Sequence, residues 1–293
     1  MTTRLLVPID ESPWSASAVD LALWIAGQSR TRYEAALVAD PARSGPARSP
    51  VELEALHVVG VTQVSGRWIE DMAGLLGFEP VVVPEQVEAF YRHRGQKLLD
   101  AVRARATAAA VPARGTLVTG NVADTICAHA AASDLVVMGL RGETEERFPG
   151  QGGSVTERVV RKAPVSTLVV PQGMARIRSL ALGYDGSDGA RRALRSTAHL
   201  AELLGTDVHV ICVGVSPPDL GDAEEQIRSA GVQVSVHRVD GEPQEALPNE
   251  AARNGCDVLA LGYRGRSALK DIFLGRTTEW LVGQVDLGIL VAR

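Results

Sequence analysis

Two loops in this sequence carry glycines next to hydroxyl or basic side chains, a pattern that suits an anion. Glycine lets the backbone approach a ligand closely, and a helix that opens directly after it points free N–H groups and a partial positive charge at a phosphate. The candidate residues of the first loop are Gly139, Gly142, Gly153, Ser154 and Thr156. Those of the second loop are Gly262, Arg264, Gly265, Gly275, Arg276, Thr277 and Thr278. The pattern predicts two phosphate-binding loops, and the alternative is that the glycines only make tight turns.

The two loops differ in charge. Ten residues lie between Gly142 and Gly153, against nine in the second loop, and the first loop is acidic at Glu143, Glu145 and Glu146. A carboxylate within about 4 Å of a phosphate costs on the order of several kcal/mol at an effective dielectric near 20, so these glutamates are expected to face solvent or a metal. The second loop is basic, but Arg276 stands where the first loop has Ser154. Its guanidinium could either grip a phosphate or fill the pocket.

Other chemistries lack their patterns in this sequence. There is no Gly-x-Ser-x-Gly elbow of a hydrolase, no Walker loop and no Gly-x-Gly-x-x-Gly fingerprint. The histidines show no metal-binding spacing, and Cys127, Cys212 and Cys256 are too few and too widely spaced for a disulfide framework or a thiolate zinc site. We therefore predict neither a catalytic residue nor a metal site. A basic run is interpreted as a solvated helix face: Arg92, Arg94, Lys97, Arg103 and Arg105.

The chain repeats itself, which indicates how the two loops are positioned. A short apolar run ending at Asp10 recurs 175 residues later, ending at Asp185. Residues 134–142 match residues 257–265 at an offset of 123, and the matched pieces follow the same order. This predicts a tandem duplication, with one domain at 1–172 and a shorter one at 173–293.

The first domain is expected to carry two insertions. One covers about 28–50, where several Pro, Ser and Arg residues indicate an excursion or flexible loop. The other covers about 64–84, an irregular apolar stretch that could cover an edge of the fold or contact a partner.

Short continuous apolar runs alternate with helical patterns in both halves. Continuous runs are typical of strands covered on both faces, so we predict an α/β fold of two tandem open parallel five-stranded sheets with helices on both faces. Ser12 and Pro13 predict the N-cap and first residue of the first helix. In such sheets ligands bind beyond the carboxyl ends of the strands, where Asp10 and Asp185 are expected to lie.

Composition narrows the function classes. The chain has 30 basic and 35 acidic residues, a net charge of −5, which argues against binding nucleic acid or anionic lipid through net charge. No run reaches the roughly 18 apolar residues of a membrane span, and the first ten residues contain no signal-peptide core. We expect a soluble, cytoplasmic protein.

The combined pattern resembles the universal stress protein family over nearly the whole chain, twice. The resemblance is carried by Val7-Pro8-Ile9-Asp10, by Tyr184-Asp185-Gly-Ser-Asp188, and by Gly-2x-Gly-9x-Gly-[Ser/Thr] after a fourth strand. It implies binding of ATP or a related adenine nucleotide, with or without Mg²⁺. It implies that the turn at Pro8 and Asp10, and that at Asp185, sits at the adenine and ribose. The main chain at Val58 and Val213 is implied to line the base pocket, and the glycine loops to hold the phosphates.

The resemblance also implies that the halves pair through their last strands, 167–170 against 289–292, and leaves a further homodimer open. Three functions remain in competition. The first is a nucleotide-binding stress or signalling module with at most slow ATP hydrolysis. The second is a nucleotide-free scaffold that binds a protein partner through 28–50 or 64–84. The third is an enzyme on the same fold.

Overall fold

The computed structural model describes residues 2–39, 49–60, 84–143, 155–214, 220–263, 281 and 286–293. Each of the ten predicted strands is present. The first half contributes β1 (Thr2–Pro8), β2 (Ser49–Gly60), β3 (Ala113–Gly120), β4 (Leu135–Gly139) and β5 (Ser166–Val170). The second half contributes β6 (Ser179–Gly183), β7 (Asp207–Val213), β8 (Val234–Val239), β9 (Val258–Gly262) and β10 (Gly288–Ala292).

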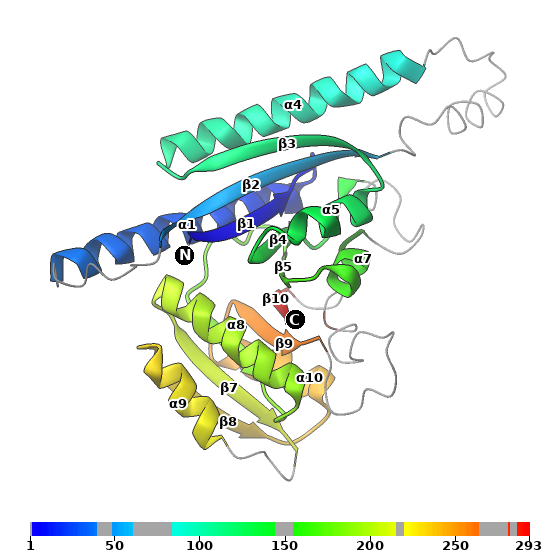
Figure 1. Cartoon of the computed structure of the whole chain (residues 1–293). Helices are drawn as coiled ribbons and strands as arrows, with labels where there is room; N and C mark the ends of the chain where they lie inside the picture. The colour runs from blue at the N-terminus through cyan, green and yellow to red at the C-terminus, as the bar shows by residue number, and fades with distance from the viewer. Residues whose placement is uncertain are drawn as a thin grey trace.

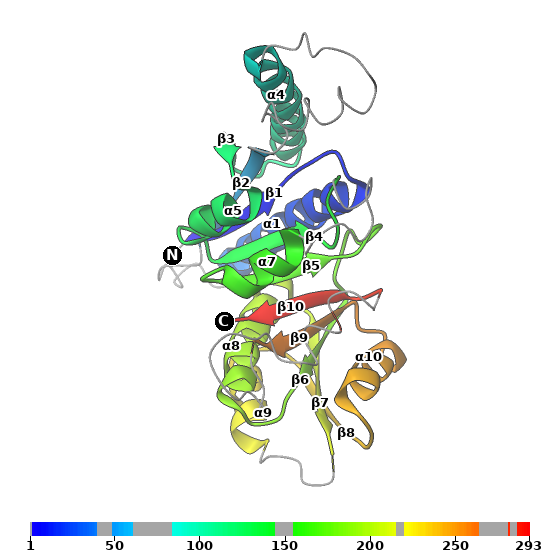
Figure 2. The ribbon, with the colours of Figure 1, turned by 90° about the vertical axis from the view of Figure 1, so that its right-hand side faces the viewer.

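All ten strands belong to one sheet, in the order β3-β2-β1-β4-β5-β10-β9-β6-β7-β8. Neighbours within each half are parallel, whereas β5 and β10 are antiparallel, with Leu168 opposite Leu290. Figure 2 shows β10 side by side with β5 where the halves meet. The predicted α/β class is confirmed, and the two five-stranded parts form one continuous sheet.

Helices cover both faces of the sheet (Figure 1). Because successive strand residues point to opposite faces, Leu5 and Val7 of β1 share a core with four helices, while Leu6 lies in a second core on the other side. The first face carries α1 (Pro13–Ala39), α4 (Pro84–Ala108), α8 (Asp188–Leu204) and α9 (Gly221–Ser229). The opposite face carries α5 (Val122–Ala130), α7 (Val155–Lys162) and α10 (Pro243–Arg253).

Helix α1 begins as predicted and ends later than predicted. The Ser12 Oγ accepts a hydrogen bond from the Ser15 N–H at 3.1 Å, so Ser12 is the N-cap. The helix then continues through Ala39, so residues 28–39 are helical and the expectation of an excursion there is wrong. These residues contain neither glycine nor proline, and nothing in them breaks the helix.

The rest of the predicted insertions is only partly described. Ser49 and Pro50 are the first residues of β2, and residues 40–48 lie outside the described residues. Of the stretch 64–84, only Pro84, which opens α4, is described. Its suggested contact with a partner therefore stays a prediction.

Candidate functional site

The strand order fixes where a ligand would bind. β1 pairs with β2 on one side and with β4 on the other, and β6 is placed in the same way between β7 and β9. The chain therefore turns to opposite sides after these neighbouring strands, and the crevice at such a switch point is the usual ligand position in open α/β sheets. Asp10 and Asp185 both lie just beyond the carboxyl end of the first strand of their half.

In the first half, a local network fixes the Asp10 carboxylate at the start of α1. Its Oδ1 accepts the Ser12 N–H at 2.9 Å, and its own N–H donates to the Ser15 Oγ at 2.9 Å. The aspartate and the N-cap serine thus form one turn, which orients the carboxylate before any ligand arrives.

In the second half, the same turn recurs. The Ser187 N–H donates to the Asp185 Oδ1 at 3.0 Å, and the Ser187 Oγ accepts the Ala190 N–H at 3.2 Å as the N-cap of α8. The duplication therefore preserves the turn geometry as well as the sequence pattern.

The glycines that end β4 and β9 allow the first helix of each half to approach the sheet. A Cβ at Gly139 would lie 2.7 Å from the carbonyl carbon of Trp14, and one at Gly262 would lie 2.3 Å from that of Gly189. Real Cβ atoms do not come so close, so helix packing alone requires glycine at both positions. Part of the glycine pattern thus has a structural reason that needs no ligand.

Gly142 brings the first glycine loop against Asp10. A Cβ at Gly142 would lie 2.9 Å from the Asp10 Oδ2, and the same oxygen accepts the Glu143 N–H at 2.9 Å. The loop and the strand-end aspartate, 133 positions apart in the chain, are therefore in direct contact. This is the juxtaposition that the sequence pattern predicts for the site.

Arg94 of α4 reaches the same place, which the sequence interpretation missed. Its Nε donates to the Glu11 Oε1 at 2.9 Å, its terminal nitrogen contacts the other Glu11 oxygen, and that nitrogen lies 3.7 Å from the Glu143 Oε1. The basic run of α4 is thus not wholly a solvated face. No spacing rule reveals a contact between residues 83 positions apart.

Four further candidates lie near this edge. The Thr156 hydroxyl is buried and donates to the Gly139 carbonyl at 3.1 Å, so it joins the start of α7 to the end of β4. Val58 and Val213 are half-buried near the carboxyl ends of β2 and β7, packed against the cores beneath α5 and α10. Pro8 is the last residue of β1, opposite Leu56.

The remaining candidates lie outside the described residues, so their role stays a prediction. They are Gly153, Ser154, Arg264, Gly265, Gly275, Arg276, Thr277 and Thr278. The acidic Glu145 and Glu146 lie outside as well.

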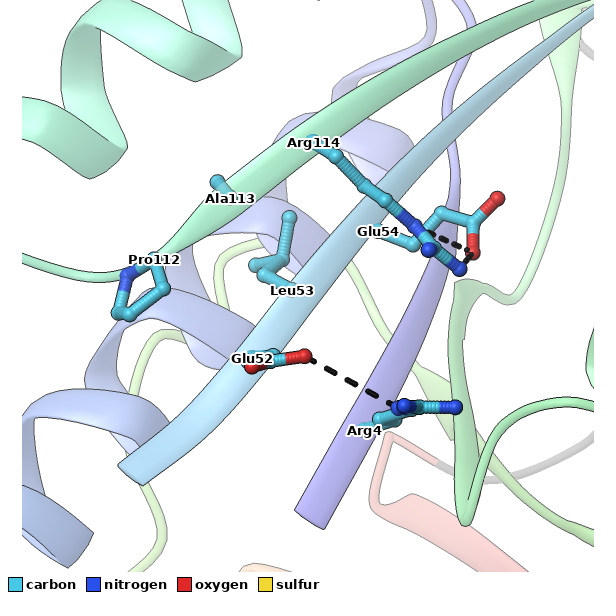
Figure 3. A pocket seen from close by; sticks show the side chains of 7 residues that line it. All are labelled: Arg4, Glu52, Leu53, Glu54, Pro112, Ala113 and Arg114. Carbon is cyan, nitrogen blue, oxygen red and sulfur yellow. Dashed lines mark hydrogen bonds and ion pairs between the residues drawn. The ribbon is translucent and has the colours of Figure 1, made fainter. Parts of the chain in front are cut away.

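A hollow of about 200 Å³ opens at the opposite edge of the sheet, where the first three strands begin. It is lined by Arg4, Glu52, Leu53, Glu54, Pro112, Ala113 and Arg114. Figure 3 shows that its charged side chains face one another: Arg114 hydrogen-bonds Glu54, and Arg4 lies 3.9 Å from Glu52. The charged side chains of the hollow are thus paired with one another, and the hollow lies at the edge of the sheet away from the switch point.

The cysteines offer no activated nucleophile. Cys212 and Cys256 are buried and Cys127 is half-buried, and burial raises the pKa of Cys212 to about 11. A thiol with such a pKa is protonated at neutral pH. Within the described ranges, no group of three or more His, Cys, Asp or Glu side chains is arranged to hold a metal ion.

Comparison with known proteins agrees with this architecture. The model of the universal stress protein family matches residues 1–171 and 218–293. The chain belongs to the universal stress protein family. The two matched segments fall in the two halves of the duplication.

Individual relatives are distant. Universal stress protein Slr1230 of Synechocystis sp. is 29% identical over 166 residues, a match that covers 55% of this chain and 58% of that protein. A universal stress protein of Thermus aquaticus is 27% identical over 135 residues, covering 40% of this chain and 98% of its own length. This chain thus spans less than two thirds of the first of these relatives.

A solved universal stress protein from Archaeoglobus fulgidus has the same fold. It aligns with 99% of this chain and 96% of its own, with a TM-score of 0.64 and 20% sequence identity. At that identity the likeness shows the fold alone. No helix in the described residues is both long and apolar enough to span a membrane.

Proposed function

We propose that this universal stress protein binds ATP or a related adenine nucleotide at the carboxyl edge of its sheet and acts as a stress-response or signalling module. The observation that carries the proposal is the contact between Asp10 and the first glycine loop at the switch point. There a fixed carboxylate could hold the base and ribose, while the loop offers backbone N–H groups to phosphates.

The second half supports the proposal by repetition. Asp185 lies in the same turn as Asp10, and Gly262 meets α8 as Gly139 meets α1. A duplicated turn and strand end give one candidate place for a nucleotide in each half. We include Mg²⁺ as a companion of the phosphates, and we propose at most slow ATP hydrolysis, since the sequence contains neither a hydrolase elbow nor a Walker loop.

The test is to denature freshly purified full-length protein, separate the released small molecules and quantify adenine nucleotide per chain. We expect about one or two per chain. Added Mg-ATP at 100 times its Kd should stabilise the protein by about 2.7 kcal/mol and raise the Tm by roughly 5 °C.

Matched variants locate the sites. Asp10→Ala and Asp185→Ala should each lower the amount of bound nucleotide, whereas Asp20→Ala should not, because Asp20 pairs with Arg105 on the exposed side of α1. Absence of nucleotide together with an unchanged Tm in Mg-ATP would reject the proposal and favour the nucleotide-free scaffold.

A further inference from the structure

We propose that Arg94 is a ligand for nucleotide phosphates in the first half, held in place by Glu11 and Glu143 until a phosphate replaces them. The inference rests on the proposed function and adds to it a residue outside the glycine loops. It assigns to α4 a direct part in distinguishing a phosphorylated ligand from a nucleoside.

Arg94 is placed between the turn expected at the adenine and ribose and the glycine loop expected around the phosphates. Glu11 directly follows Asp10, and Glu143 directly follows Gly142. The Arg94 guanidinium hydrogen-bonds Glu11 and lies 3.7 Å from the Glu143 carboxylate. It therefore bridges the strand-end turn and the glycine loop, beside the loop that would hold the phosphates of a nucleotide.

The negative charge around Asp10 means that a phosphate needs a cation nearby to bind there. Asp10, Glu11 and Glu143 bring three carboxylates together, and each would repel a phosphate nearby. A guanidinium can bind a phosphate by two parallel hydrogen bonds, which compensates that repulsion directionally. With 27% of its side chain exposed, Arg94 can be reached by a ligand.

A phosphate can displace the two carboxylates from Arg94 at a small cost in free energy. The Glu11 side chain is 37% exposed, and an ion pair at such a position contributes little because water solvates the freed carboxylate. Stacking near Phe90, at 5.6 Å from the ring centroid, keeps the guanidinium at the loop while its anionic partner changes.

The second half is built differently at this position. Its corresponding helix α9 has nine residues against 25 in α4, and its Arg228 pairs with Glu224 of the same helix. We therefore assign the phosphate contact to the first half.

The test is calorimetric titration of the full chain with ATP, ADP, AMP and adenosine. Arg94→Gln should weaken ATP binding in the first half about ten-fold and leave adenosine binding unchanged, because only phosphates gain from the guanidinium. The loss should shrink from ATP to AMP. Arg94→Lys should restore part of the ATP affinity.

Two further variants separate a ligand role from a structural one. Glu11→Gln should strengthen ATP binding about three-fold, because it removes a competitor for Arg94. A structural ion pair predicts instead that both variants weaken binding alike. Arg92→Gln is the matched control, since Arg92 contacts Thr119 and Glu88 away from the loop.

Equal losses for ATP and adenosine in Arg94→Gln, or an unchanged ATP affinity, would overturn the assignment while leaving nucleotide binding intact. A wild-type chain that binds none of the four compounds would overturn the proposed function and this inference with it. Thermal melting followed by circular dichroism verifies that each variant is folded.

Discussion

In the first half of the sheet a carboxylate on the second strand meets an imidazole on the third helix, whereas in the second half the two groups have exchanged places. Glu54 of β2 accepts from the His129 Nδ1 of α5 at 3.1 Å. His209 of β7 lies 3.0 Å from the His237 Nε2, and the His237 Nδ1 lies 3.4 Å from Glu250 of α10. Both links join the second strand to the helix that covers it.

The positions correspond one to one. Glu54 stands four residues before Val58, as His209 does before Val213, and His129 and Glu250 each stand eight residues after the N-cap of their helix. The Thr116 hydroxyl, which donates to Glu54 at 3.0 Å, corresponds to His237. Both halves of the duplicated fold therefore carry a polar link at this place, with the carboxylate and the imidazole in exchanged positions.

The two links differ in the charge state that their surroundings favour for the residue on the strand. Burial pushes the pKa of Glu54 upward, but hydrogen bonds from Arg114, His129 and Thr116 outweigh it and hold that pKa below its ordinary value. In the second half, burial and then the neighbouring His237 lower the pKa of His209, against the opposing charge of Asp207. The strand residue of the first link, Glu54, is thus held as a charged carboxylate, whereas that of the second link, His209, is held as a neutral imidazole.

The largest expected effect concerns another feature shared by the two halves, the glycine that ends the fourth strand. Gly262→Ala should lower the free energy of unfolding by about 3 kcal/mol and Gly139→Ala by about 2 kcal/mol, because both overpack backbone against backbone and Gly262 has the closer approach. Urea unfolding of the two variants measures the difference.

The control for this pair is Gly27→Ala. A Cβ at Gly27, inside α1, would meet nothing within 4 Å, so the alanine should raise stability by about 0.5–1 kcal/mol through helix propensity. Equal losses at Gly139 and Gly262 would show that the two halves pack their first helices alike.

The next largest loss of stability is expected when the Glu54 carboxylate of the first link is removed. Glu54→Ala should cost about 2 kcal/mol, because it leaves the hydrogen-bonding groups around a buried carboxylate without their acceptor. Glu52→Ala, two residues earlier on the same strand and half exposed, should change stability by less than about 0.5 kcal/mol. Similar losses in the two variants would mean that Glu54 acts only as a surface charge.

The sequence predicted the strands, the helix start at Ser12 and Pro13, and the strand-end position of Asp10, because each depends on neighbouring residues. It did not predict the two polar links or Arg94, since their partners are 13 to 83 residues apart. Glu54 interrupts the apolar pattern of β2. A charged residue inside a strand is the one local signal that could have indicated a buried partner.

The smallest expected effect is the pH dependence of the second link. Because the folded state lowers the pKa of His209, the unfolded chain binds a proton at this residue more readily, and stability should fall as the pH drops below about 6.5. The loss from Glu54 begins only near pH 4.5, because its pKa is also lowered and its carboxylate is protonated there first in the unfolded chain.

Tm measured at pH 7.5, 6.5 and 5.5 separates the two links. His209→Gln should flatten the decline between pH 7 and 5, whereas His93→Gln, on the exposed side of α4, should keep the wild-type slope. An unchanged slope in His209→Gln would show that the second link accepts a proton as readily when folded as when unfolded. The contrast between a charged Glu54 and a neutral His209 at the same strand position would then fail, because both positions would tolerate a charged side chain.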